Sequence, residues 1–167
     1  MKKYGIVNMN KLTLFFPSVI AVAVICFSGC FDSSQKESKL VVINVLDQKY
    51  YDDCHIKGSI NIPFDEFENQ LQKLDKKDSY VFYCSNYACT AAPFSAEIMK
   101  KAGFNQVYVY HGGIVEWYQK KYPYQGPAKL DYLQEENEQL DDEDNHNKLP
   151  VLTADELKAK MQKANLL

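Results

Sequence analysis

The amino-acid sequence predicts an α/β protein with a parallel sheet flanked by helices. Short apolar, β-branched runs recur along the chain and are typical of strands buried on both faces of a sheet. Stretches with apolar residues three or four positions apart, typical of helices, lie between these runs, and such alternation calls for crossover connections. With 167 residues, 46% of them hydrophobic, the chain is long enough for one core but not for two domains of ordinary size.

The predicted elements alternate from residue 40 onward. Strands are expected at residues 40–45, 59–62, 80–83 and 107–110. Three helical stripes follow the second, third and fourth strands: Phe64, Phe67, Leu71 and Leu74; Ala91, Phe94, Ile98 and Ala102; Ile114, Trp117 and Tyr118. The second helix is closed by Gly103, and the third starts behind Gly112-Gly113 and ends at Pro123.

The first thirty residues predict an export signal, because three Lys precede an apolar run over residues 12–27. A single membrane anchor is the alternative, but 16 residues that include Pro17 are few for a span of ~20. The block Phe27-Ser28-Gly29-Cys30 resembles a bacterial lipobox. That resemblance implies removal of residues 1–29, a lipid on Cys30 that binds the membrane, and a bacterial envelope location facing the periplasm. Residues 30–38 are then a polar tether.

Residues 127–148 predict a solvated acidic linker, since residues 131–144 carry eight acids and no Lys. A metal-binding acidic tract is the disfavoured alternative. The last segment, residues 149–167, predicts an amphipathic helix that begins with a capping box between Thr153 and Glu156.

Charge and cysteine content limit the possible functions. All 19 basic residues are Lys and the net charge is −3, which argues against a nucleic-acid partner. Three thiols, Cys54, Cys84 and Cys89, remain once Cys26 and Cys30 are assigned to the N-terminal segment, and an odd number cannot all pair within the chain. In an exported protein Cys84 and Cys89 could be oxidised. The Cys and His spacing shows no zinc pattern, so neither a metal nor a cofactor is expected.

Cys84 is the candidate nucleophile. It follows the strand at residues 80–83 and precedes the helix at 91–102, and this junction is where open α/β folds place chemistry. Backbone N–H groups of the loop, together with the helix N-terminus, could stabilise a thiolate there. The loop residues that would supply them are Ser85, Asn86, Tyr87, Ala88 and Thr90. Cys89 places a second thiol in the same loop and suggests sulfur or redox chemistry.

Four blocks of sequence follow one another within residues 39–126. They are Val42 to Leu46, His55-Ile56-Lys57-Gly58-Ser59-Ile60-Asn61-Ile62-Pro63, Val81-Phe82-Tyr83-Cys84, and Gly112-Gly113-Ile114-Val115-Glu116-Trp117. In this order and spacing they resemble a rhodanese-like domain. The resemblance implies a sulfurtransferase whose Cys84 accepts sulfane sulfur from a small donor as a persulfide and passes it to a thiol or another acceptor. In the family His55 would order its loop, whereas Cys54 is expected to be structural. His111 lies near the expected site but is more simply a surface residue.

The loop departs from the usual family pattern at two positions. Active members usually carry a Gly within the loop and an Arg five residues after the nucleophile, where this chain has Tyr87 and Cys89. Thiosulfate should therefore bind weakly unless Lys57 or another Lys reaches in. The Cys-x4-Cys loop resembles that of some members, and Cys89 could resolve a Cys84 persulfide. Three alternatives stay open: Cys89 as a small buried residue, a catalytically weak binding module, and a thiol-disulfide oxidoreductase using both cysteines.

A typical domain of this kind opens with a short strand and a helix that are absent before residue 39. Residues 148–157 resemble that opening, displaced to the C-terminus. Residues 149–166 are therefore expected to dock as a permuted edge element, on their own domain or on a neighbouring molecule. An independent helix that binds nothing is the alternative.

Overall fold

The computed structural model describes residues 37–138 and 149–167. The predicted signal peptide, Cys30 and residues 139–148 of the predicted linker lie outside the described residues. The central sheet has four strands in the order β3-β1-β4-β5, and every neighbouring pair is parallel. Its strands are β1 (Leu40–Asn44), β3 (Ile60–Asn61), β4 (Ser79–Tyr83) and β5 (Val107–Tyr110). A second, antiparallel pair joins β2 (His55–Ile56) to β6 (Tyr124–Gln125).

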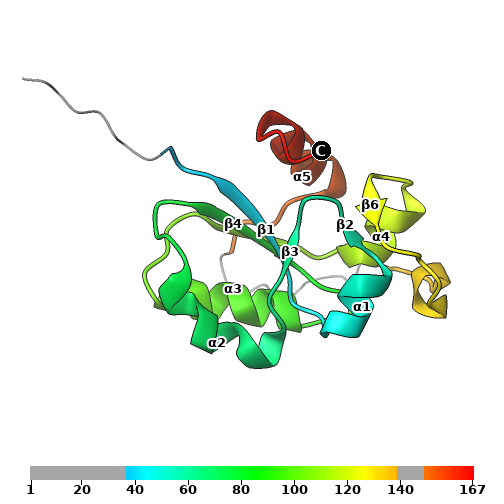
Figure 1. The fold of residues 1–167 in the computed structure, drawn as a ribbon, viewed down its shortest axis with the longest axis horizontal. Coiled ribbons are helices and arrows are strands. Elements are labelled where there is room, and N and C mark those ends of the chain that lie inside the picture. Colours follow the sequence, from blue (N-terminus) through cyan, green and yellow to red (C-terminus); the bar gives the residue numbers. More distant parts are fainter. Residues whose placement is uncertain (1–36, 139–148) are drawn as a thin grey trace, which may run out of the picture. The chain divides into compact units, whose positions relative to one another are not determined.

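The helices are α1 (Gln48–Asp53), α2 (Phe67–Gln70), α3 (Ala91–Lys101), α4 (Gly113–Gln119) and α5 (Ala154–Lys163). Short 3₁₀ turns, η1 (Phe64–Glu66) and η2 (Leu71–Lys73), flank α2, and η3 (Asp131–Gln134) follows β6. In Figure 1 α2 and α3 lie on one side of the sheet and α5 lies on the other. The predicted class, a parallel sheet flanked by helices, is confirmed.

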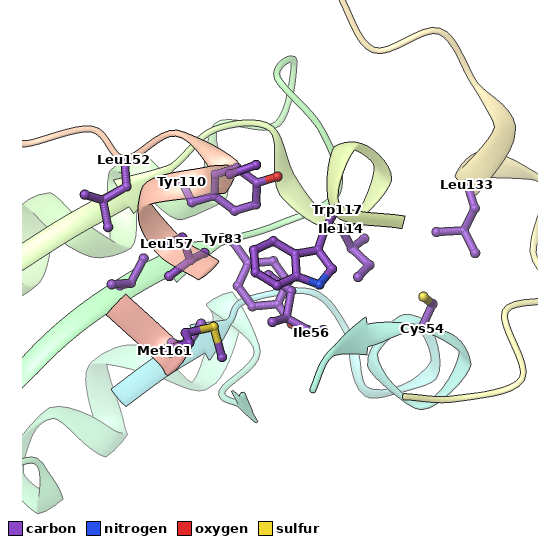
Figure 2. Packing of buried hydrophobic residues seen from close by; sticks show 13 residues of the cluster. Cys54, Ile56, Tyr83, Tyr110, Ile114, Trp117, Leu133, Leu152, Leu157 and Met161 are labelled. Atoms are coloured by element: carbon purple, nitrogen blue, oxygen red, sulfur yellow. The ribbon is translucent and has the colours of Figure 1, made fainter. Parts of the chain in front are cut away.

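Side chains of the central strand β4 alternate between two apolar cores. Tyr80 and Phe82 pack with residues of α3, whereas Val81 and Tyr83 pack with residues of α4 and α5. All four are buried, as expected for a strand covered on both faces. The core on the α5 side is shown in Figure 2.

The structure corrects two features of the predicted helices. The stripe from Phe64 to Leu74 forms a single α-helical turn between two 3₁₀ turns, and none of these segments has a side-chain cap that would extend it. In α3 the predicted stripe is wrong for Phe94, which is 53% exposed. The helix instead buries Ala92, Ala96 and Met99, because small residues let it approach the sheet closely. The sequence analysis also missed α1.

The C-terminal segment packs on the sheet of its own chain. Val151 forms a parallel bridge with Val109 of β5. The Val109 N–H donates to the Pro150 carbonyl oxygen at 3.0 Å, and the Leu152 N–H donates to the Val109 carbonyl oxygen at 2.8 Å. α5 begins with a complete capping box, in which Thr153 and Glu156 exchange hydrogen bonds. Figure 2 shows Leu152 and, from α5, Leu157 and Met161 on the side of the core that contains Tyr83 and Tyr110.

Part of the predicted linker is folded. Leu133 of η3 is fully buried, and the Lys129 N–H donates to the Asp53 carboxylate at 2.9 Å. Residues 127–148 were expected to form a solvated linker. This expectation is wrong for the start of the segment, because Leu133 packs in the hydrophobic core. Among the residues that the structure describes, no helix is both long and apolar enough to cross a membrane.

Candidate active site around Cys84

Cys84 lies at the carboxyl end of the sheet. It follows β4, which is hydrogen-bonded to β1 on one side and to β5 on the other. Residues 84–90, called the Cys84 loop below, then lead into α3. The structure thus puts the predicted nucleophile and all the predicted loop residues in one turn between the central strand and a helix.

Cys84 and Cys89 form a disulfide in this structure, with their Cα atoms 6.4 Å apart. The turn is closed by the Cys89 N–H, which donates to the Asn86 carbonyl oxygen at 3.2 Å. Cys84 is only 2% exposed and packs against the core on the α3 side, whereas Cys89 is partly buried at the margin of that core. The sulfur of Cys84 therefore faces the loop through its bond to Cys89, but is shielded from solvent.

Several backbone amides of the Cys84 loop are not used by the fold. The N–H groups of Tyr87 and Cys89 have acceptors, Asn137 Oδ1 at 3.1 Å and the Asn86 carbonyl oxygen. Within residues 37–138 and 149–167, no acceptor is found for four other loop amides, those of Ser85, Asn86, Ala88 and Thr90. Such donors are available to an anion or to water.

The Gly112-Gly113 turn supports the loop from behind. The N–H groups of Ile114 and Val115 donate to the carbonyl oxygens of Cys84 and Ser85, each at 3.0 Å. Gly113 has φ +62°, and a Cβ at this position would overlap with the Ser85 carbonyl group and lie 2.7 Å from the Asn86 amide nitrogen. Glycine is required here both for the backbone conformation and for the close contact with the loop.

An acidic side chain is hydrogen-bonded to the loop. Glu116 of α4 accepts hydrogen bonds from the hydroxyls of Tyr87, at 3.2 Å, and Tyr110, at 3.0 Å. Burial raises the pKa of both tyrosines, and the carboxylate raises it further, so both stay protonated as donors. The Lys120 ammonium pairs with Glu116 at 3.7 Å, and in the described part of the chain no Lys side chain bonds to the loop itself.

Lys57 does not supply the missing cation. Its N–H donates to the Pro123 carbonyl oxygen, and the neighbouring Gly58 lies against the backbone of Leu166, on the side of the C-terminal segment. Nothing in its described contacts brings it to the Cys84 loop.

Asn137 is a loop contact that sequence reasoning missed. Its Oδ1 accepts the Tyr87 N–H, and its Nδ2 donates to the Gly112 carbonyl oxygen at 2.9 Å. One amide side chain from the acidic segment thereby links the loop to the glycine turn. The available signal was weak: Asn137 is the neutral residue in the run from Glu135 to Glu138.

The other candidate residues lie outside the loop. Cys54 is fully buried in the core on the α5 side, and burial, with a smaller effect of the Asp53 charge, raises the pKa of its thiol to about 12. His55 stacks on Tyr51 at 3.8 Å, and its Nδ1 is 2.7 Å from the Tyr51 carbonyl oxygen, which fits a structural role. His111 follows β5 and is partly buried.

A surface hollow of about 410 Å³ lies elsewhere, around α1 and the segment after β6. It is lined by Lys49, Tyr50, Asp52, Asp53, Pro127 and Leu130. The Asp53 carboxylate is already used there to accept the amides of Lys129 and Leu130. None of the lining residues belongs to the Cys84 loop, so this hollow is separate from the candidate site.

Comparison with known proteins assigns the fold to a family. The model of the family described as the rhodanese-like domain matches residues 30–120. The chain is 30% identical over 83 residues to the HTH-type transcriptional regulator Rv0324 of Mycobacterium tuberculosis, covering 50% of this chain and 36% of that protein. It is 27% identical over 82 residues to the thiosulfate sulfurtransferase GlpE of Coxiella burnetii, covering 49% of this chain and 75% of that protein.

One solved structure resembles this chain in its fold. The BH2092 protein from Bacillus halodurans superposes with a TM-score of 0.51 at 30% identity, over 56% of this chain and 69% of that chain. The family match covers more than half of the chain and includes the central sheet and the Cys84 loop. The chain therefore belongs to the rhodanese-like domain family.

Proposed function

We propose that the chain is a sulfurtransferase in which Cys84 takes sulfane sulfur from a small donor as a persulfide and passes it to a thiol or another acceptor. The observation that carries the proposal is the position of Cys84, at the end of the central strand β4 and under a loop with four amides that have no acceptor in the described residues. A persulfide bears negative charge on its outer sulfur. Preorganised amides stabilise such charge better than water does, since they need no reorganisation.

The oxidised loop is a resting state in this proposal. Cys84 is shielded and bonded to Cys89, so it cannot act as a nucleophile before the disulfide is reduced. Cys89 is the less buried of the two residues, and we propose that a reducing thiol attacks its sulfur. Reduction frees Cys84 as the leaving thiolate, at the start of the loop that carries the unpaired amides.

The charge around the loop favours a donor other than thiosulfate. Thiosulfate carries two negative charges and is held best by a guanidinium, which this chain lacks altogether. The carboxylate of Glu116, which accepts the Tyr87 hydroxyl, places a further negative charge beside the loop. We therefore propose low-molecular-weight persulfides as donors in preference to thiosulfate.

Peptide mass spectrometry of the reduced chain tests the proposal. Because the chain contains no Arg, cleavage after Lys releases residues 78–100 as one peptide that holds Cys84 and Cys89 and no other cysteine. After exposure to glutathione persulfide, the Cys89→Ser variant should yield this peptide with one added sulfur atom. Cys84→Ser should not gain sulfur, and Cys54→Ala should behave as the parent chain does. Failure of Cys89→Ser to gain sulfur from any donor would leave the binding module as the better explanation.

A thiol-disulfide oxidoreductase is the second candidate, and the Cys84–Cys89 disulfide favours it. Equilibration with glutathione buffers of increasing oxidised fraction distinguishes the two functions. The oxidoreductase would be supported if the 78–100 peptide changed reversibly between its dithiol and disulfide forms. The chain should then also exchange disulfides with a test substrate, and it should not gain sulfur.

The cellular location belongs to the same proposal. A lipid on Cys30 would hold the domain at the bacterial envelope, where disulfides persist and where donor and acceptor would be encountered outside the cytoplasm. Metabolic labelling with a fatty-acid analogue checks this point. Label should enter the parent chain and be lost in Cys30→Ala, and equal labelling of both would exclude this residue as the lipid site.

A further inference from the structure

The Cys84 loop brings two thiols together and separates them from the third. The Cα atoms of Cys84 and Cys89 are 6.4 Å apart, and the turn between them is held by the bond from the Cys89 N–H to the Asn86 carbonyl oxygen. Cys54 packs in the core on the α5 side, whereas Cys84 packs in the core on the α3 side. Any intramolecular reaction of Cys84 among the described cysteines is therefore with Cys89.

We propose that Cys89 resolves the Cys84 persulfide within the loop and releases sulfide, which makes the domain a persulfide reductase as well as a sulfur acceptor. The inference rests on the proposed persulfide at Cys84. The Cys89 thiolate attacks the inner sulfur, Sγ of Cys84, and forms the Sγ–Sγ bond. The bond between the inner and outer sulfur atoms of the persulfide breaks, and its electron pair leaves with the outer sulfur. This sulfur takes up the proton that the Cys89 thiol has lost and departs as hydrosulfide. The two cysteine sulfurs are oxidised to the disulfide, and the sulfane sulfur is reduced to sulfide.

Access to the two sulfur atoms of the persulfide decides between transfer and release. An external thiol that attacks the outer sulfur carries it away and leaves the Cys84 thiolate. Attack on the inner sulfur releases sulfide, and that atom belongs to a residue that is 2% exposed in the oxidised loop. Cys89 reaches it from inside the loop, as the disulfide demonstrates. A tethered neighbour also reacts at an effective concentration far above that of a free thiol, ~10⁵–10⁸ M in well-oriented cases.

The surroundings of the loop assist the departure of hydrosulfide. The amides of Ser85, Asn86, Ala88 and Thr90 can donate to the leaving anion, since they have no acceptor within the described residues. No described Lys side chain bonds to the loop, so none would hold the anion there. Glu116 accepts a hydrogen bond from the Tyr87 hydroxyl and pairs with Lys120. The amides stabilise the charge while it forms, and the absence of a cation lets the product go.

The cycle is completed by two equivalents of a small thiol. The first attacks the sulfur of Cys89, the more exposed partner, and forms a mixed disulfide while Cys84 leaves as a thiolate. The second attacks the mixed disulfide at the small-molecule sulfur and restores Cys89. The net reaction consumes one persulfide sulfur and two thiols, and yields sulfide and one small-molecule disulfide.

A single turnover without added reductant tests the inference. The reduced full chain, in detergent and without oxygen, is mixed with glutathione persulfide, after which free sulfide and the 78–100 peptide are measured. The parent chain should release one equivalent of sulfide per chain above the Cys89→Ser variant, and its peptide should become two hydrogen atoms lighter. Cys89→Ser and Cys89→Ala should instead keep a peptide with one added sulfur. Cys54→Ala should match the parent chain.

The possible outcomes separate this inference from the function on which it rests. A parent chain that keeps the added sulfur as stably as Cys89→Ser does, without extra sulfide, overturns resolution by Cys89 and leaves the sulfurtransferase proposal intact. If neither chain gains sulfur and no extra sulfide appears, the persulfide at Cys84 is itself refuted. Extra sulfide from Cys84→Ser equal to that from the parent chain would also overturn the inference, because release would then not pass through Cys84.

Discussion

Replacing Leu157 by Ala tests whether the C-terminal segment is part of the folded domain in solution. Leu157 is fully buried and belongs to the core that includes Tyr83 and Trp117 (Figure 2). Leu to Ala changes in closed cores cost about 2–5 kcal/mol of unfolding free energy. α5 rests on the sheet by one face only and can settle toward it, so we expect the lower half of that range, about 2–3 kcal/mol.

The measurement is urea unfolding of the full chain, with Gln162→Ala as the control. Gln162 lies in the same helix but is exposed, so its replacement should change the unfolding free energy by less than about 0.5 kcal/mol. Hydrogen exchange of the Val109 and Leu152 amides, which bond between β5 and the segment, should accelerate in Leu157→Ala. Equal stability and equal exchange in the two variants would refute docking, and a loss that depends on protein concentration would show docking between chains.

Three further predictions concern the loop and the buried thiol. Gly113→Ala should slow persulfide formation and lower the free energy of unfolding by at least ~1–2 kcal/mol, the cost of placing a non-glycine residue in the left-handed region. The control is Gly103→Ala. Gly103 also has a positive φ, +88°, but the atom near its added Cβ is the Lys76 ammonium, so this change should lower stability without affecting the loop. Asn137→Ala removes two hydrogen bonds of about 0.5–1.5 kcal/mol each, and should speed exchange of the Tyr87 amide; an unchanged rate would mean that this bond is not formed in solution. Burial raises the pKa of Cys54 from 9.0 to about 12, so the folded state keeps a proton that the unfolded state loses. Stability should therefore fall as pH rises from about 9 toward 12, and the fall should be smaller in Cys54→Ala, as measured by urea unfolding at each pH.

The central strands were predictable because burial on both faces leaves a strong compositional signal. The runs that form β1, β4 and β5 are almost wholly apolar and lie between polar segments, and the structure places strands there with shifts of one residue at the ends. Helix α1 was missed for the opposite reason. It has six residues, mostly polar, and only Asp53 among them is buried, so no apolar period reveals it.

The position of Phe94 shows where periodicity alone gives the wrong answer. A spacing of three or four residues identified α3 correctly as a helix but could not decide which face meets the sheet. A face built from Ala and Ser packs more closely than a face built from Phe, so the small residues are buried and the large one is exposed. The apolar spacing therefore predicted helix α3 correctly but not which of its faces is buried against the sheet.

Cys84 could be singled out from the sequence, but its surroundings could not. The position after an apolar strand and before a helix predicts a loop with free amides, because strand and helix both leave backbone groups unpaired at such a junction. The contacts of Glu116 and Asn137 with the loop depend on how α4 and the acidic segment fold back. Whether Cys84 and Cys89 pair likewise depends on the path of the turn between them, which the four intervening residues do not determine by sequence alone.

The C-terminal segment and the loop are connected through β5. In the described residues, the backbone that pairs with the outer side of β5 comes from residues 150–152, which bond to both the N–H and the carbonyl group of Val109. The next residue, Tyr110, donates to Glu116, which also accepts the hydroxyl of Tyr87 in the loop. The expected docking of residues 149–166 at a sheet edge of their own domain is thus found beside β5. Because β5 carries Tyr110, residues 150–152 hold in place the strand whose tyrosine hydroxyl bonds to Glu116, the acceptor of the Tyr87 hydroxyl in the Cys84 loop.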